Sequence, residues 1–75
     1  MKVKGIISSN IIHVGTSIEH SVWDHILVDG RPVKLSLVKN NAFVMIEYTG
    51  GDGKPGCTLV PVQNLSCLVV DPETK

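Results

Sequence analysis

Alternating apolar and polar residues between positions 22 and 48 predict an antiparallel meander of three strands. Three runs rich in β-branched and aromatic residues are separated by two short polar turns, Asp29-Gly30 and Asn40-Asn41. Asp-Gly is a typical two-residue hairpin loop, because glycine readily adopts the positive φ that a type I′ turn requires. Asn-Asn can serve the same purpose, because asparagine tolerates a left-handed φ better than most residues do.

The two turns predict the same register for the middle strand. Counting outward from the first turn places Val28 opposite Arg31, and counting from the second turn places Leu35 opposite Ile46. Both counts put the same apolar residues on one face, which we expect to be the core face: Ile26, Val28, Val33, Leu35, Leu37, Val44, Ile46 and Tyr48. The first count also places Asp24 on this face, opposite Leu35, and a bulge or a later strand start would remove it.

Residues 16–22 allow a second interpretation, a single helical turn. Thr16 and Glu19 fit a capping box, in which each side chain binds an otherwise unpaired backbone N–H group. Apolar residues recur every four positions from Ile18 to Ile26, which is helical spacing. We therefore expect a turn or one short helical turn here, followed by the first strand of the meander.

The rest of the chain predicts short strands separated by turns. Strands are expected at residues 2–7, 11–14, 58–62 and 66–70, with a turn at 8–10 and a tight turn or one turn of 3₁₀ helix at 62–65. The segment 49–56 is rich in glycine and contains Pro55, so we expect a mobile loop in which strand pairing is blocked. The predicted organisation is one β-barrel domain over residues 1–70 and a polar tail over residues 71–75.

This series of short strands without a strong long helix predicts an all-β fold, either a small barrel or a rolled antiparallel sheet, since closure protects strand edges. The pattern over residues 59–70, LVPVQNLSCLVV, resembles the end of a Src-homology-type barrel. In that architecture a strand ending in proline precedes a short turn and a last aliphatic strand. The resemblance implies architecture alone, because the aromatic groove residues of the peptide-binding members are not visible in this sequence.

Composition and charge narrow the functional classes. The 75 residues make a single domain, and seven basic residues balance seven acidic ones. This neutral charge disfavours nucleic-acid binding, which depends on Lys and Arg neutralising phosphates. An Sm-like or oligonucleotide-binding barrel is further disfavoured by the presence of only three aromatic residues. No apolar run is long enough to span a membrane and the N-terminus lacks a signal-peptide core, so we expect a cytoplasmic protein.

Five residues of the glycine-rich segment are candidates for binding a small anion: Gly50, Gly51, Asp52, Gly53 and Lys54. Their backbone N–H groups could form a nest around a negatively charged group. The segment does not match the P-loop pattern, because the lysine is followed by proline and a first glycine is missing. A flexible hairpin loop without a ligand is the more frequent meaning of such a segment.

Candidate metal ligands are His13, His20 and His25, with Glu19 and Asp24. Their spacing matches neither a zinc nor a calcium pattern, so we expect no metal and no cofactor. They are more simply explained as solvated or capping polar residues.

The two cysteines, Cys57 and Cys67, lie in aliphatic runs and are expected to be buried, inert free thiols. If their strands were adjacent, the two side chains would point to opposite faces, which is poor geometry for a disulfide. No nucleophile elbow or paired-carboxylate pattern is present either, so we do not expect an enzyme.

A second apolar face of the meander carries the functional prediction: Trp23, Leu27, Phe43 and Met45, with Val38 beside them. This face is either a second part of the core or an interface, since large exposed apolar patches are uncommon on monomers. Tryptophan is enriched at binding hot spots and methionine adapts to varied partners.

The sequence thus predicts a small non-enzymatic binding protein. The first hypothesis is a regulatory or inhibitory protein–protein interaction module that contacts a protein partner, or a second copy of itself, through these four residues. The alternative is a homo-oligomeric binder of a small anionic ligand such as a nucleotide, held between subunits with the glycine-rich loop.

Overall fold

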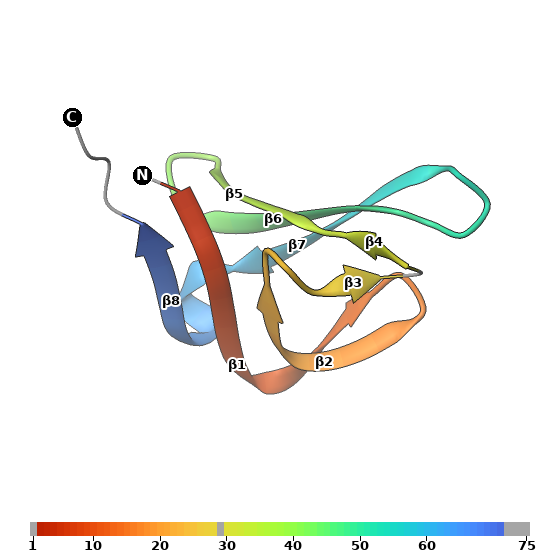
Figure 1. Ribbon diagram of the computed structural model, residues 1–75. Coiled ribbons are helices and arrows are strands. Elements are labelled where there is room, and N and C mark those ends of the chain that lie inside the picture. Colours follow the sequence, from red (N-terminus) through yellow and green to blue (C-terminus); the bar gives the residue numbers. More distant parts are fainter. Residues whose placement is uncertain (1, 29, 72–75) are drawn as a thin grey trace.

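The computed structural model describes residues 2–28 and 30–71, which form strands and one short 3₁₀ helix (Figure 1). The elements are β1 (Lys2–Val14), β2 (Ser17–Trp23), β3 (Leu27–Val28), β4 (Arg31–Pro32), β5 (Lys34–Val38), β6 (Phe43–Thr49), β7 (Pro55–Pro61), η1 (Val62–Asn64) and β8 (Leu65–Asp71). They form three antiparallel sheets in the orders β2-β1-β8, β3-β4 and β5-β6-β7. The predicted all-β class is confirmed.

β1 is one bent strand, where the sequence predicted two strands and a turn at residues 8–10. It pairs with β8 over its first half and with β2 along most of its length. The pairing with β2 shifts between Ile7 and Ile12, so the polar residues between them form a bulge and do not reverse the chain. The Asn10 amide donates a 3.1 Å hydrogen bond to the Ser8 hydroxyl within this bulge. The bulge bends β1 without ending it.

The predicted helical turn near residues 16–22 is wrong, because residues 17–23 form β2. The chain turns at Gly15, which has a φ of 58°, and β2 then returns along β1. Val22 lies opposite Ile6, and both side chains are fully buried. Pairing with β1 and burial of this apolar pair outweigh the local capping-box signal.

The first hairpin of the meander is shorter than predicted. Val28 does lie opposite Arg31, and the Val33 amide donates to the Ile26 carbonyl at 3.2 Å. The predicted pairing of Asp24 with Leu35 is wrong, because β2 ends one residue earlier and the ladder between β3 and β4 is short. Residue 29 of this turn lies outside the described residues.

The second hairpin has the predicted register. Leu35 lies opposite Ile46 in the β5–β6 ladder, and the loop between the strands spans residues 39–42. Lys39, Asn40 and Asn41 all have positive φ, from 54° to 66°. The left-handed conformation expected of two asparagines therefore extends to the lysine before them.

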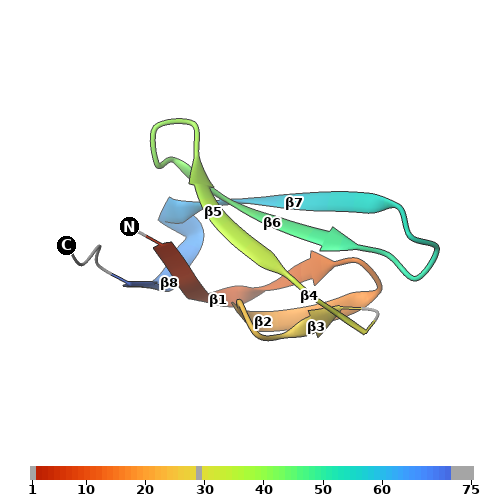
Figure 2. The same ribbon diagram turned by 45° about the horizontal axis from the view of Figure 1, so that its top comes forward.

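The last part of the chain returns to its beginning. Pro55 was expected to block pairing, yet it lies opposite Thr49 at the start of β7, where a proline is tolerated at a strand end. The predicted 3₁₀ turn is confirmed as η1, and β8 follows it directly. Figures 1 and 2 show β8 beside β1 at one edge of the molecule, so the first and last strands of the described chain are neighbours.

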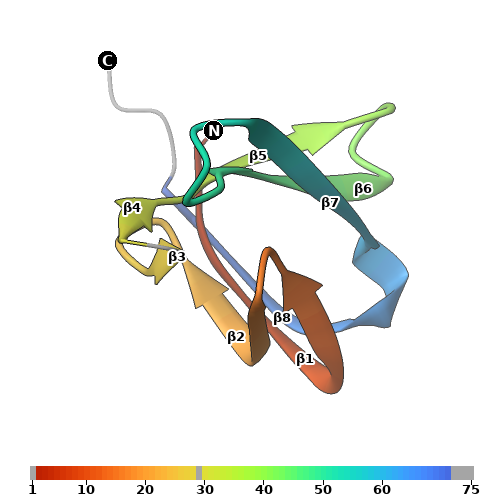
Figure 3. The same cartoon turned by 90° about the vertical axis from the view of Figure 1, so that its right-hand side faces the viewer.

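The core lies between the β2-β1-β8 and β5-β6-β7 sheets, which face each other in Figure 3. Five residues of the predicted core face are buried, and the half-buried Leu37 and Tyr48 pack against the core. Ile26 is also half-buried. The opposite sheet supplies Val3, Ile6, Ile12, Val14 and Val22 to the same cluster. The meander thus contributes only one wall of the core.

Candidate functional site

The four residues predicted to form one binding face are divided among different parts of the fold. Phe43 and Met45 lie on β6, whereas Trp23 ends β2 in the opposing sheet and Leu27 lies in the small β3-β4 sheet. Side chains alternate between the two faces of a strand, so each position can be assigned a face from its buried neighbours. The structure brings Phe43 and Met45 together and leaves the other two elsewhere.

Trp23 covers a glycine on the outer face of its own sheet. It lies opposite Gly5, next to the pair Val22–Ile6 that points into the core, so its own ring points outward. A Cβ atom added to Gly5 would come within 2.3–2.8 Å of three atoms of the indole ring. The half-buried ring therefore lies flat against the backbone of β1, an arrangement in which an aromatic residue shields a strand glycine. The same arrangement recurs in the other sheet, where the Tyr48 ring covers Gly56.

Phe43 and Met45 belong to an apolar surface on the outer face of the β5-β6-β7 sheet. Two rows of directly opposed residues cross the three strands, Val38–Phe43–Pro61 and Ser36–Met45–Leu59. Their inward neighbour Val44 is fully buried, which assigns the two rows to the outer face. We call the five apolar residues of these rows the outer patch: Val38, Phe43, Met45, Leu59 and Pro61. Leu59 is exposed, at 44 %, and the other four residues are half-buried.

The sequence-based prediction missed Leu59 and Pro61. The length of the glycine-rich loop does not fix the register between β6 and β7. From the sequence, therefore, no residue of β7 could be paired with the residue opposite it on β6. The signal was present in Pro61, since a proline inside an apparent strand indicates an edge. β7 is indeed at the edge of its sheet.

A charged row closes one end of the outer patch. Lys34, Glu47 and Cys57 lie side by side across the same three strands, one step beyond the row that contains Met45. A lysine and a glutamate directly opposite one another attract weakly at a solvent-exposed position. The patch is therefore apolar in its two rows and polar on this border.

The glycine-rich loop spans residues 50–54 and joins β6 to β7, extending away from the rest of the chain in Figure 1. Its backbone is held by hydrogen bonds within the loop. The Gly50 amide donates to the Lys54 carbonyl, the Gly53 amide to the Gly50 carbonyl, and the Lys54 amide to the Asp52 carboxylate, at 2.9–3.0 Å. Three of the N–H groups that could bind an anion are thus already used, so the anionic-ligand hypothesis stays a prediction without support from this loop.

Both cysteines are exposed, so the prediction of buried thiols is wrong. Cys57 lies on β7 opposite Glu47, and Cys67 lies on β8 opposite Ile7. Their strands belong to different sheets and are not paired with one another. The two cysteines therefore do not lie on adjacent strands, which was the premise of the disulfide prediction. An edge strand that packs on one side of a core directs every second side chain to solvent. Both cysteines occupy such positions.

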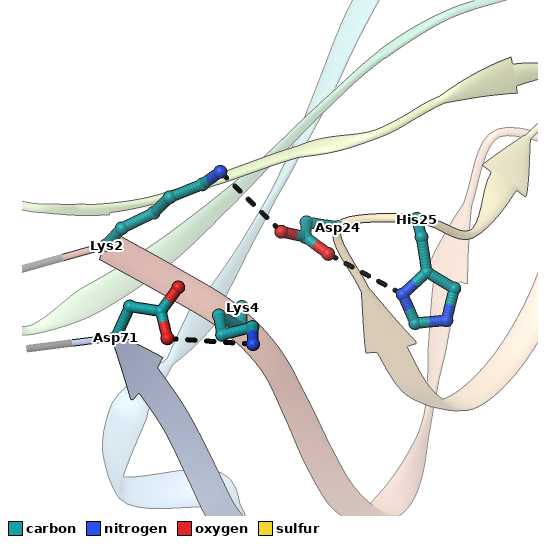
Figure 4. Close-up of polar contacts among 5 residues, drawn as sticks. All are labelled: Lys2, Lys4, Asp24, His25 and Asp71. Carbon is teal, nitrogen blue, oxygen red and sulfur yellow. Dashed lines mark ion pairs between the residues drawn. The ribbon is translucent and has the colours of Figure 1, made fainter.

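Two of the candidate metal ligands, Asp24 and His25, lie in contact with one another. Within residues 2–28 and 30–71, no cluster of three or more potential ligands is found. Asp24 contacts Lys2 at 3.7 Å and the Nδ1 atom of His25 at 3.6 Å, while Lys4 contacts Asp71 at 3.6 Å (Figure 4). The Asp24 amide also donates to the Lys4 carbonyl at 2.8 Å. These exposed pairs join the ends of β1, β2 and β8 and contribute little to stability.

A shallow groove of about 300 Å³ lies between β1 and β7. Its polar lining comes from Ser8, Asn10, His13, Thr58 and Asn64. The Thr58 hydroxyl donates to the His13 carbonyl at 2.9 Å, which joins the two strands across the groove.

Comparison with known proteins supplies no relative: no protein family, no curated protein and no solved structure matches this chain. Among the described residues, no helix has the length and apolar character needed to cross a membrane.

Proposed function

We propose that this protein is a small non-enzymatic binding module that contacts a protein partner through the outer patch. The observation that carries the proposal is the register of the β5-β6-β7 sheet, which places five apolar residues side by side on a face that points away from the core. Leu59 is exposed and the other four residues are half-buried, so the patch forms a contiguous, partly exposed apolar surface, which is typical of interaction sites. Within this proposal the protein has a regulatory or inhibitory role, because it would act on its partner by binding alone.

The composition of the outer patch suits protein recognition. An aromatic residue and a methionine lie at its centre, on the middle strand, and both types are enriched at the centres of interfaces. Lys34 and Glu47 border it, so the patch has a polar rim on one side of an apolar centre. This distribution matches the usual anatomy of an interface.

We further propose a Src-homology-type architecture for the domain. Three features support it: a three-stranded meander, a 3₁₀ turn between its last strand and the final strand, and pairing of the final strand with the first. The short turn that leads into a last aliphatic strand is the feature implied by the sequence pattern over residues 59–70. The outer patch is then a surface of a small barrel-like scaffold, whose rigid strands hold the contact residues in place.

Leu59→Glu is expected to weaken partner binding at least about tenfold, because it places a charge on the apolar surface of the proposed interface, next to Met45. The partner would first be captured with tagged protein from cells of the source organism, identified by mass spectrometry, and purified. Binding would then be measured by isothermal titration calorimetry with both purified proteins. Leu27→Glu is the matched control, since Leu27 is also exposed, at 60 %, but lies on β3 outside the outer patch.

Both variants should keep the circular dichroism spectrum and melting temperature of the wild type, because neither side chain is buried. Equal losses of binding in the two variants, or unchanged binding in Leu59→Glu, would refute the assignment of the interface to the outer patch. A loss confined to Leu27→Glu would move the interface to the β3-β4 sheet.

A further inference from the structure

Four strands lie at the edges of the two larger sheets, and three of these edges carry features that prevent pairing with another chain. Edge strands expose unpaired backbone groups, and natural proteins protect them with prolines, charges or covering segments. β7 has prolines at both ends, Pro55 and Pro61, and its Thr58 is hydrogen-bonded to β1. β5 carries Lys34 and follows Pro32. β2 carries Glu19, which lies opposite the buried Ile12 and therefore on the inward face.

β8 is the edge without such protection. From Leu65 to Val70 it contains no proline and no charged side chain, and its charged residue Asp71 lies at the end, in contact with Lys4. Its ladder with β1 shifts twice: at Ser66 of β8, between the pairs that contain Leu65 and Cys67, and at Lys4 of β1, between the pairs Val3–Val70 and Gly5–Val69. The extra residue of the second shift belongs to β1, so residues 67–70 of β8 itself are consecutive and uncharged, and among the described strands only β1 pairs with them. Figure 2 shows β8 at the margin of the molecule.

We infer that β8 pairs with β8 of a second copy of this chain, antiparallel about a twofold axis through Leu68. The two β2-β1-β8 sheets then form one continuous sheet across the axis. This partner is favoured by charge, because self-pairing of the uncharged stretch places no charge opposite a like charge, and the whole chain has a formal net charge of zero. A symmetric contact between two identical strands also closes on itself, so it ends at the dimer.

The register centred on Leu68 places Cys67 of each copy directly opposite Val69 of the other copy. Cys67 lies opposite Ile7 and Val69 lies opposite Gly5, so both belong to the outer face, where Ile7 is 38 % exposed. Pairing of the edges brings the apolar side chains of the two outer faces together near the axis. The outer patch lies on the other sheet and stays accessible in both copies, so this inference goes beyond the proposed function and does not depend on it.

Cys67→Lys should raise the dissociation constant of the dimer at least about tenfold, because it adds a charge next to the axis in both copies. Cys57→Lys is the matched control: the same substitution at an exposed cysteine of β7, in the other sheet. Sedimentation velocity of the full chain in reducing buffer, over a concentration series, would measure the dimer. The inference predicts a dimer for the wild type and for Cys57→Lys. A monomeric wild type, or a dimer that survives in Cys67→Lys, would overturn it.

A second measurement tests the register. In the Cys57→Ser background, Val69→Cys is expected to give a disulfide-linked dimer on mild oxidation, because the new thiol lies directly opposite Cys67 of the other copy. Cys57→Ser alone should give none, since the two Cys67 residues are diagonal neighbours about 7–8 Å apart, beyond the usual reach of a disulfide. A linked dimer in Cys57→Ser alone, or none with Val69→Cys, would refute the axis at Leu68.

Discussion

Ile46→Ala is expected to leave most of the chain unfolded at 37 °C. Ile46 lies at the middle of the central strand β6 and is fully buried in the cluster between the two sheets. Removing a buried isoleucine side chain to the Cβ atom costs about 3–4 kcal/mol, from lost apolar burial and from the cavity that remains. A core of this size supplies only about 3–5 kcal/mol of net stability, so one such cavity removes most of it.

Ile18→Ala is the matched control for this prediction. Ile18 is 60 % exposed on β2, so the same chemical change should cost less than about 0.5 kcal/mol. Urea unfolding followed by circular dichroism would measure both variants, and dispersion of amide resonances would show whether Ile46→Ala retains a folded population. Similar midpoints for the two variants would contradict the assignment of Ile46 to the core.

Gly5→Ala is expected to destabilise the fold by about 1–3 kcal/mol, although the substitution adds a single methyl group. The added Cβ atom would lie within 2.3–2.8 Å of the Trp23 ring, so the ring must move away from β1. Trp23 is the only tryptophan, and its fluorescence should shift to longer wavelength as the ring becomes more exposed to water. Gly51→Ala is the control, because a Cβ atom there meets nothing within 4 Å and should change stability by less than about 0.5 kcal/mol.

A double-mutant cycle separates the contact between Gly5 and Trp23 from a general effect on β1. Trp23→Ala alone should cost about 2 kcal/mol, since it uncovers the backbone that the half-buried ring shields. In that background Gly5→Ala should cost little, giving a coupling energy of at least about 1 kcal/mol. Additive costs would show that the methyl group acts on something other than the ring.

This packing changes how Trp23 should be used in binding experiments. If Trp23 belonged to the binding face predicted from the sequence, Trp23→Ala would abolish association and leave the fold intact. In the structure the ring supports β1, so Trp23→Ala is expected to lower stability as well. Leu59→Glu is the cleaner probe of the proposed interface, because Leu59 is exposed and lies in the outer patch.

The two proposed surfaces lie on different sheets, so they can act together. A dimer joined through β8 would present two copies of the outer patch. Two linked binding surfaces raise the apparent affinity for a partner that can engage both. The Cys67→Lys variant would then lose this gain while a single patch keeps its own affinity.

The sequence by itself determined the β5–β6 hairpin and one wall of the core. A short turn and a two-residue side-chain period set the register locally, because a slip of one residue would turn the apolar set of Leu35 and Ile46 to solvent. The 3₁₀ turn after Pro61 was predictable for the same reason, since it depends on neighbours in the chain. Such features are encoded within windows of a few residues.

Only the tertiary structure decided the features that depend on distant strands. The polar run after Ile7 is a bulge and not a turn because β2 pairs with β1 on both sides of the bend, and residues 17–23 are strand for the same reason. Pairing of β1 with β8 determines that Cys67 is exposed, and pairing of β1 with β2 sets Trp23 over Gly5. No local window contains the partner strand, and the free energy of pairing and burial exceeds the local propensities that pointed elsewhere.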